Sequence, residues 1–167
     1  MNQFTLVKSI GVAVNECDVA HEAIRRVDFD SLLIAGRYTL LEQDALDEFL
    51  PLCQARQVSV IVGGGYNSGI LATGAVPGAK YNYAPASDAI LERVRTIEHL
   101  CRDFNVPLKS AALQFVLGHP AIEIIIPGVR SIDQLHENIT TFGAEVPAEF
   151  WTELKHQRLI RPDAPTP

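Results

Sequence analysis

The chain alternates between two kinds of segment, and this alternation limits its fold more than any other feature of the sequence. Four short apolar runs rich in β-branched residues predict strands, and segments with helical periodicity separate them. The strands are expected at residues 9–14, 31–35, 58–62 and 123–126. Strands joined through helices run parallel, because each crossover returns the chain to the same end of the sheet. We therefore predict an α/β fold whose parallel strands are buried on both faces.

The segments with helical periodicity predict helices between and after the strands. Asp18 is the expected N-cap of the first helix, which runs to about Val27. The second runs from about Asp44 to Gln57 and is expected to kink or restart near Pro51, because proline has no N–H to donate. Further helices are expected at about residues 87–105 and 108–118, then from 131 and from 147 onward.

Composition limits the classes of function. With 167 residues and 47% apolar content, the chain can bury one sizeable core, so we expect one domain over residues 1–160 and a flexible tail at 161–167. A net charge of −6 argues against a broad nucleic-acid or anionic-membrane surface. The three cysteines and five histidines lack the spacing of a disulfide framework or a metal site. Residues 1–8 do not resemble a signal peptide, so we expect a cytoplasmic protein.

The segment from Glu123 to Asn138 is the richest in functional signals. An apolar run ends in a Pro-Gly turn, and Ser131 then opens a helix with Gln134 three residues later, in the form of a capping box. The free N–H groups of this helix start suit a phosphate, and Arg130 adds positive charge. An ordinary turn followed by a solvated helix face explains the same pattern.

Two stripes at helical spacing divide this helix. The apolar stripe is expected to pack against the protein, and the polar stripe to face solvent or a ligand. The apolar stripe consists of Ile132, Leu135, Ile139 and Phe142, and the polar stripe of Gln134, Glu137, Asn138 and Thr141.

Two parallel architectures compete, an open doubly wound sheet and part of a (β/α)8 barrel. The glycine-rich start of the long connection at residues 63–85 lacks the dinucleotide fingerprint, because Ser68 stands where the last glycine is needed, and no P-loop lysine follows. A glycine-bearing loop after one strand and a phosphate-suited helix start after the next is instead the arrangement after strands seven and eight of a barrel.

Four stretches resemble strands five to eight of the aldo-keto reductases: GVAVNE, LIAGRYTLL, GGGYNSGIL and IPGVRSIDQLHEN, which begin at residues 11, 33, 63 and 126. The most similar branch contains the aldose dehydrogenases that oxidise L-fucose or D-threo-aldoses, together with pyridoxal 4-dehydrogenase. The resemblance implies the C-terminal half of a (β/α)8 TIM barrel, with four parallel strand-helix units plus a C-terminal helix. It also implies an oxidoreductase that uses NAD or NADP.

The resemblance assigns a cofactor role to ten residues. Asn15 matches the asparagine that binds the nicotinamide carboxamide. The loop residues Asn67, Ser68, Gly69 and Leu71 match the pyrophosphate loop, Gly128 and Arg130 match the turn at the 2′-phosphate or ribose, and Gln134, Glu137 and Asn138 match the adenosine-binding residues. Many NADPH-specific members have lysine and arginine where this chain has Gly128 and Gln134, so both NAD and NADP stay open, with Arg130 as the 2′-phosphate candidate.

The family's catalytic aspartate, tyrosine, lysine and histidine come from its first four strands, and no residue here matches them. The resemblance therefore implies a cofactor-binding half without catalytic residues. The isolated chain is then expected to turn over an aldose or aldehyde slowly or not at all. A truncated or regulatory module that binds nucleotide or assembles without catalysis is the alternative. In either case, the open inner face predicts a homo-oligomer or a separate N-terminal half as partner.

Overall fold

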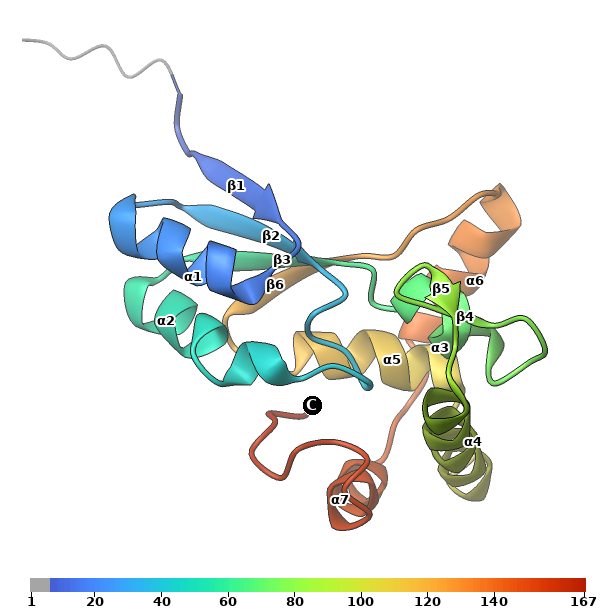
Figure 1. The fold of residues 1–167 in the computed structure, drawn as a ribbon. Coiled ribbons are helices and arrows are strands. Elements are labelled where there is room, and N and C mark those ends of the chain that lie inside the picture. Colours follow the sequence, from blue (N-terminus) through green and yellow to red (C-terminus); the bar gives the residue numbers. More distant parts are fainter. Residues whose placement is uncertain (1–6) are drawn as a thin grey trace, which may run out of the picture.

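Four parallel strands form the central sheet, in the order β1-β2-β3-β6 (Figure 1). The computed structural model describes residues 7–167, so most of the segment considered for a signal peptide lies outside it. The strands are β1 (Gly11–Val14), β2 (Ser31–Ala35), β3 (Ser59–Gly63) and β6 (Ile122–Ile126). Every neighbouring pair is parallel. The alternation of strands and helices therefore predicted the sheet correctly.

The helices follow the predicted order; the first N-cap differs from the prediction, and the restart expected near Pro51 is confirmed. They are α1 (Cys17–Arg26), α2 (Phe49–Arg56), α4 (Asp88–Asp103), α5 (Leu108–Leu117), α6 (Ile132–Phe142) and α7 (Ala148–His156). The N-cap of α1 is Glu16, so the expectation of Asp18 was wrong; Asp18 lies in the first turn, where its charge suits the helix dipole. A short 3-10 turn, η1 (Asp44–Leu46), precedes α2, which places Pro51 in the first turn, where its missing N–H is not needed.

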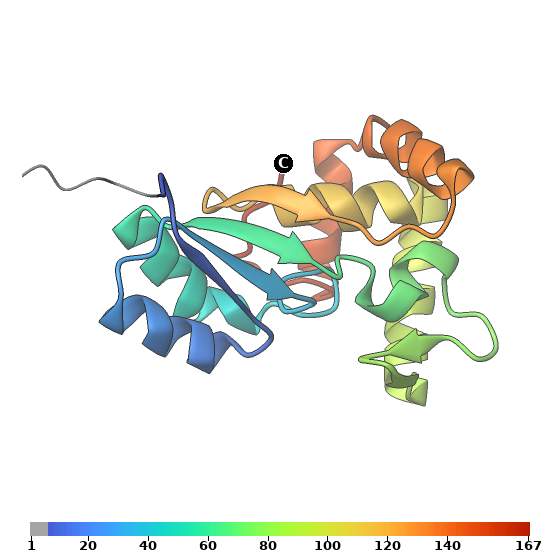
Figure 2. The ribbon, with the colours of Figure 1, turned by 90° about the horizontal axis from the view of Figure 1, so that it is seen from above.

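Only one face of the sheet is buried, which corrects the expectation of burial on both faces. Leu32 and Val60 point toward the helices and are fully buried, whereas their neighbours Leu33 and Ile61 are half-buried. Figure 1 shows α1, α2 and α5 beneath the sheet, and within residues 7–167 no helix covers the opposite face. Seen from above in Figure 2, α6 lies beyond the β6 edge.

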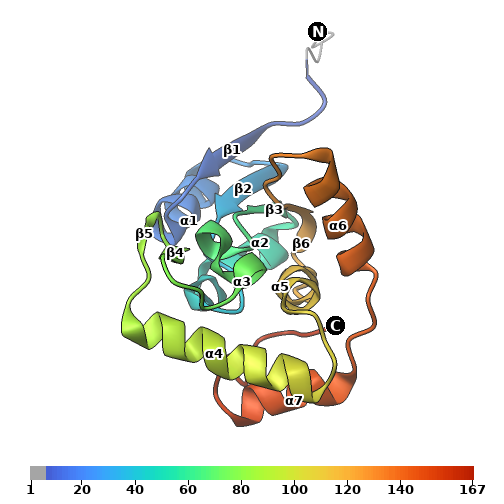
Figure 3. The same ribbon diagram turned by 90° about the vertical axis from the view of Figure 1, so that its right-hand side faces the viewer.

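The long connection after β3 has structure of its own. It contains the 3-10 turn η2 (Asn67–Gly69), the short helix α3 (Ile70–Thr73) and a hairpin of β4 (Lys80–Tyr81) and β5 (Ala84–Pro85). Figure 3 shows α3, this hairpin and α6 around the carboxyl ends of the strands. This is the end at which α/β proteins bind ligands.

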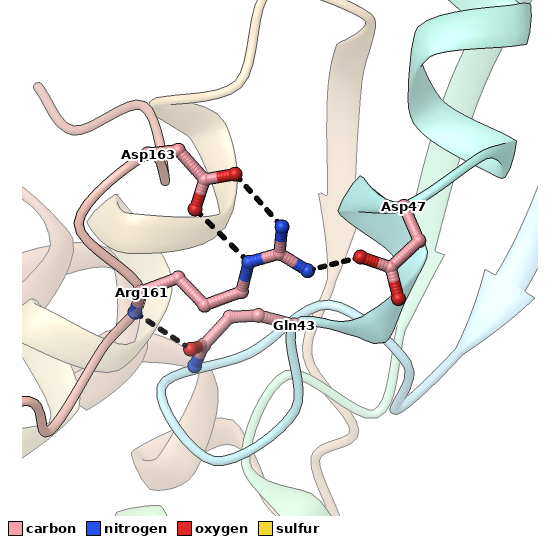
Figure 4. A network of polar contacts seen from close by, with 4 residues as sticks. All are labelled: Gln43, Asp47, Arg161 and Asp163. Carbon is pink, nitrogen blue, oxygen red and sulfur yellow. Dashed lines mark hydrogen bonds and ion pairs between the residues drawn. The ribbon is translucent and has the colours of Figure 1, made fainter.

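Residues 161–167, for which the sequence predicts a flexible tail, contact the domain in the structure. The Arg161 guanidinium pairs with Asp47 and Asp163, and the Arg161 N–H donates to Gln43 Oε1 at 3.1 Å (Figure 4). Ala164 is almost fully buried. The segment therefore fixes the 3-10 turn before α2 to the end of the chain.

Candidate functional site

A cavity of about 640 Å³ lies beyond the carboxyl ends of β3 and β6. Its walls come from the glycine loop after β3, the β4–β5 hairpin, and the turn between β6 and α6. A volume of this size is typical of small-molecule and cofactor sites. The cavity collects seven of the ten predicted cofactor residues, namely Ser68, Gly69, Gly128, Arg130, Gln134, Glu137 and Asn138.

The start of α6 is fixed by side-chain caps. Ser131 Oγ accepts a hydrogen bond from the Gln134 N–H at 3.2 Å, as the capping box predicts. The Gln134 side chain returns to the Arg130 N–H at 2.8 Å, one residue earlier than in the usual reciprocal bond. Together these bonds hold the turn that carries Arg130 against the positive end of the helix dipole.

Two glycines in the cavity lining leave backbone accessible. A side chain added at Gly69 or at Gly128 would meet no atom within 4 Å, so a ligand can approach both backbones closely. Gly69 has φ of +102°, and Asn67 and Ser68 before it also have positive φ. The loop therefore turns tightly and presents its backbone to the cavity.

The charges around the cavity favour an anion. Lys80, Lys109 and Arg130 line it together with one carboxylate, Glu137. Lys109 Nζ pairs with Glu137 Oε1 at 2.5 Å, while Lys80 and Arg130 form no ion pair with any residue from 7 to 167. Two uncompensated cations beside a helix start suit phosphate groups. The backbone cradle and these charges fit the diphosphate of a dinucleotide.

Tyr66 joins the glycine loop to α6. Its hydroxyl donates to Asn138 Oδ1 at 2.9 Å, and both side chains are buried. Burial, and then the nearby Glu137 charge, raises the pKa of Tyr66 to about 12, so the phenol stays protonated as a donor. Asn138 consequently keeps a fixed orientation in the cavity wall.

Three predicted cofactor residues lie outside the cavity lining. Asn15 is exposed at the end of β1, where its carbonyl accepts from Arg37 Nε at 2.8 Å. Asn67 is buried, with its side-chain N–H directed at the Gly36 carbonyl at 3.5 Å, and Leu71 is fully buried in the core. The cavity therefore corresponds to one part of the predicted site.

Lys80, Lys109 and Tyr83 line the cavity but were not found by reasoning from the sequence. Lys109 lies in the first turn of α5, and the other two lie in a hairpin that was expected only as irregular loop. Only the length of that connection indicated that it had a function.

The apolar stripe of α6 corrects another expectation. The predicted packing stripe faces outward, with Ile132 72%, Leu135 46%, Ile139 63% and Phe142 42% exposed. The polar stripe lies on the side that was predicted for solvent or a ligand, since Gln134, Glu137 and Asn138 line the cavity. The Thr141 carbonyl accepts from Ser110 Oγ at 2.7 Å, which joins α6 to α5. On β6, Ile124 and Ile126 are also about half exposed.

Residues 7–167 lack two further features. They contain no group of three or more His, Cys, Asp or Glu side chains arranged to hold a metal ion. None of their helices is both long enough and apolar enough to cross a membrane.

A parallel α/β half-barrel with an anion-attracting cavity at the carboxyl end of its strands defines the class of this protein. The chain belongs to the aldo/keto reductase family, whose family model matches residues 5–158. It corresponds to the C-terminal half of these (β/α)8 barrels, as the sequence motifs predicted.

Comparisons with individual proteins agree with this assignment. The chain is 41% identical over 154 residues to pyridoxal 4-dehydrogenase of Microbacterium luteolum, covering 92% of this chain and 45% of that protein. It is 36% identical over 163 residues to D-threo-aldose 1-dehydrogenase of a Pseudomonas species, covering 97% of this chain and 48% of that protein. The holo form of aldo-keto reductase AKR11C1 from Bacillus halodurans superposes with a TM-score of 0.68 at 26% identity. The match covers 90% of this chain and 49% of that structure. The chain thus spans about half the length of the curated relatives it matches.

Proposed function

We propose that this chain binds a nicotinamide dinucleotide, NAD or NADP, and forms the cofactor-binding half of an aldo-keto reductase-type oxidoreductase. The observation that supports this most directly is the cavity, which combines exposed glycine backbone, a capped helix start and two cations, Lys80 and Arg130, that have no ion-pair partner within residues 7–167. The dinucleotide supplies a nicotinamide ring that accepts or donates a hydride.

Each wall of the cavity has a separate role in this proposal. The backbone of Ser68 and Gly69 follows the pyrophosphate, and the turn from Gly128 to Arg130 meets the 2′-phosphate or ribose. Gln134, Glu137 and Asn138 hold the adenosine end, while Asn15, outside the cavity, contacts the nicotinamide carboxamide. Arg130 is the only side chain in this set that carries a positive charge, so a preference for NADP depends on it.

The substrate class follows from the relatives. Their names specify a pyridoxal dehydrogenase and an aldose dehydrogenase, so we propose hydride transfer between the cofactor and an aldose or another small aldehyde. The proton-transfer groups are expected from the half of the barrel that precedes this one in the family. The chain alone should therefore turn over substrate slowly or not at all.

Isothermal calorimetry of the purified chain with NADH and with NADPH tests cofactor binding. We expect saturable binding that Arg130→Ala weakens, more strongly for NADPH because the 2′-phosphate loses its charged partner. Arg25→Ala is the matched control, since it removes the same charge from an exposed position on α1, remote from the cavity lining. If neither nucleotide binds the wild-type chain, the proposal is wrong.

A non-catalytic module is the second candidate. The exposed apolar stripe of α6 and the exposed isoleucines of β6 support it, because a surface of this kind is characteristic of assembly. A turnover assay with L-fucose and NAD⁺ tests this second candidate. Measurable NADH production by the isolated chain would contradict a purely non-catalytic role.

A further inference from the structure

At the tip of the β4–β5 hairpin, Tyr83 has a left-handed backbone conformation. Asn82 and Tyr83 join the two strands, with φ of 47° and 64°. Two consecutive left-handed residues form the tight turn of a two-residue hairpin, in which glycine is common at the second position. The backbone of a residue with a bulky side chain is strained at positive φ. Strain of this kind is concentrated at ligand sites and switches.

Hydrogen bonds hold this turn against its surroundings. The Tyr83 N–H donates to Ser68 Oγ at 2.9 Å, which fixes the tip to the glycine loop. The neighbouring Tyr81 hydroxyl donates to the Glu42 carboxylate, which fixes the base of the hairpin. Arg93 donates to the carbonyl oxygens of Leu40 and Leu41, so the segment before Glu42 is itself anchored. The strained conformation is therefore imposed from both ends.

The Tyr83 ring is not packed in the protein. Its residue is 91% exposed and nevertheless lines the 640 Å³ cavity, as does Lys80 from the same hairpin. Figure 3 places the hairpin and α6 as separate elements around the ends of the strands. For the protein alone, both the strain and the exposed ring are unfavourable. They become useful when a ligand covers the ring.

We propose that Tyr83 is a ligand-binding residue whose ring packs against the adenosine diphosphate half of a dinucleotide in this cavity, an inference that rests on the proposed function. The wall formed by Glu137 and Asn138 provides polar groups for that half, and the ring supplies the flat apolar surface that a purine or ribose needs. Stacking between a base and an aromatic side chain does not depend on the identity of the base, and it strengthens binding considerably. The hairpin thus acts as a preformed wall that determines how firmly the nucleotide is held.

Calorimetry with the full chain tests the inference, with NADPH, ADP-ribose and reduced nicotinamide mononucleotide as ligands. We expect Tyr83→Gly to weaken the binding of NADPH and of ADP-ribose by about 5- to 100-fold. The affinity for the mononucleotide should not change. The same variant should raise Tm by about 2–4 °C, because glycine relieves the strain. Tyr83→Phe keeps the ring and should bind like the wild type.

Asn82→Gly is the matched control, because it makes the same turn more flexible without removing the ring. Asn82 is exposed and does not line the cavity, so its substitution should leave all three affinities unchanged. If Tyr83→Gly raises Tm but binds NADPH like the wild type, while Arg130→Ala still weakens it, the inference is wrong and the proposed function stands. If the wild-type chain binds none of the three ligands, both are wrong.

Discussion

His119 is the buried residue through which pH should act most directly on stability. It lies between α5 and β6, where its Nδ1 accepts from the Ala121 N–H at 3.1 Å and its ring contacts Tyr38 edge-on at a centroid distance of 5.6 Å. Burial lowers the pKa of His119, because charging the ring inside the protein costs solvation. The folded state therefore holds the imidazole neutral, with Nδ1 as an acceptor.

The sign of the pH effect follows from this depressed pKa. Below the unfolded value of about 6.5, the unfolded chain binds a proton that the folded chain excludes, so stability falls on acidification. We expect a loss of up to about 1.4 kcal/mol per pH unit from this group below pH 6.5. In His119→Asn the side-chain oxygen still accepts from Ala121 without titrating. Urea unfolding between pH 7 and 5 should give a shallower slope for this variant, and equal slopes would contradict the prediction.

At the scale of elements, the cap of α6 connects helix stability to the proposed site. Ser131→Ala removes the acceptor for the Gln134 N–H and should cost about 1 kcal/mol of helix stability. Because the cavity wall includes the first turns of α6, we expect faster amide exchange there and weaker binding of NADPH. Hydrogen exchange and calorimetry measure the two effects.

Ser87→Ala provides the matched control for this cap. Ser87 Oγ accepts from the Ile90 N–H at 3.4 Å at the start of α4, which does not line the cavity. We expect a comparable local loosening of α4 with unchanged affinity for NADPH. If both variants weaken binding equally, the effect is one of general stability and the specific role of the α6 cap is disproved.

The sequence predicted those elements whose signals are local. The apolar runs located the strands of the sheet, and Ser131 with Gln134 located the start of α6, because strand propensity and capping depend on near neighbours. The burial of the apolar stripe of α6 was mispredicted, since helical periodicity identifies an apolar stripe but not the surface that covers it. Tyr83 and Lys80 were missed because tertiary contacts, such as the Ser68 bond to the hairpin tip, place them at the cavity.

At the scale of the whole molecule, the sheet has two unpaired edges. β1 pairs only with β2, and β6 only with β3, within the part of the chain that the structure describes. Parallel sheets are ordinarily covered on both faces, yet Ile124, Ile126 and the α6 stripe remain exposed here. The chain also spans about half the length of relatives in a family of eight-stranded barrels. A complementary half-barrel would pair both edges and cover this face.

We expect a second copy of the chain to supply that half in the purified protein. Two copies related by a two-fold axis along the barrel can place β1 of one beside β6 of the other at both seams, which gives eight parallel strands. The same arrangement covers the apolar stripe of α6. Because an open parallel edge and an exposed apolar helix face are both unfavourable in water, closure should be strongly preferred.

Light scattering coupled to size exclusion measures this association. We expect a mass of twice the 18.3 kDa chain at micromolar concentration, and dissociation in Ile139→Lys, which introduces a charge into the α6 stripe. Val76→Lys is the control, because Val76 is 46% exposed in the connection before the hairpin, away from both sheet edges. A wild-type chain that stays monomeric on dilution would contradict the prediction and favour a separate N-terminal half as the partner.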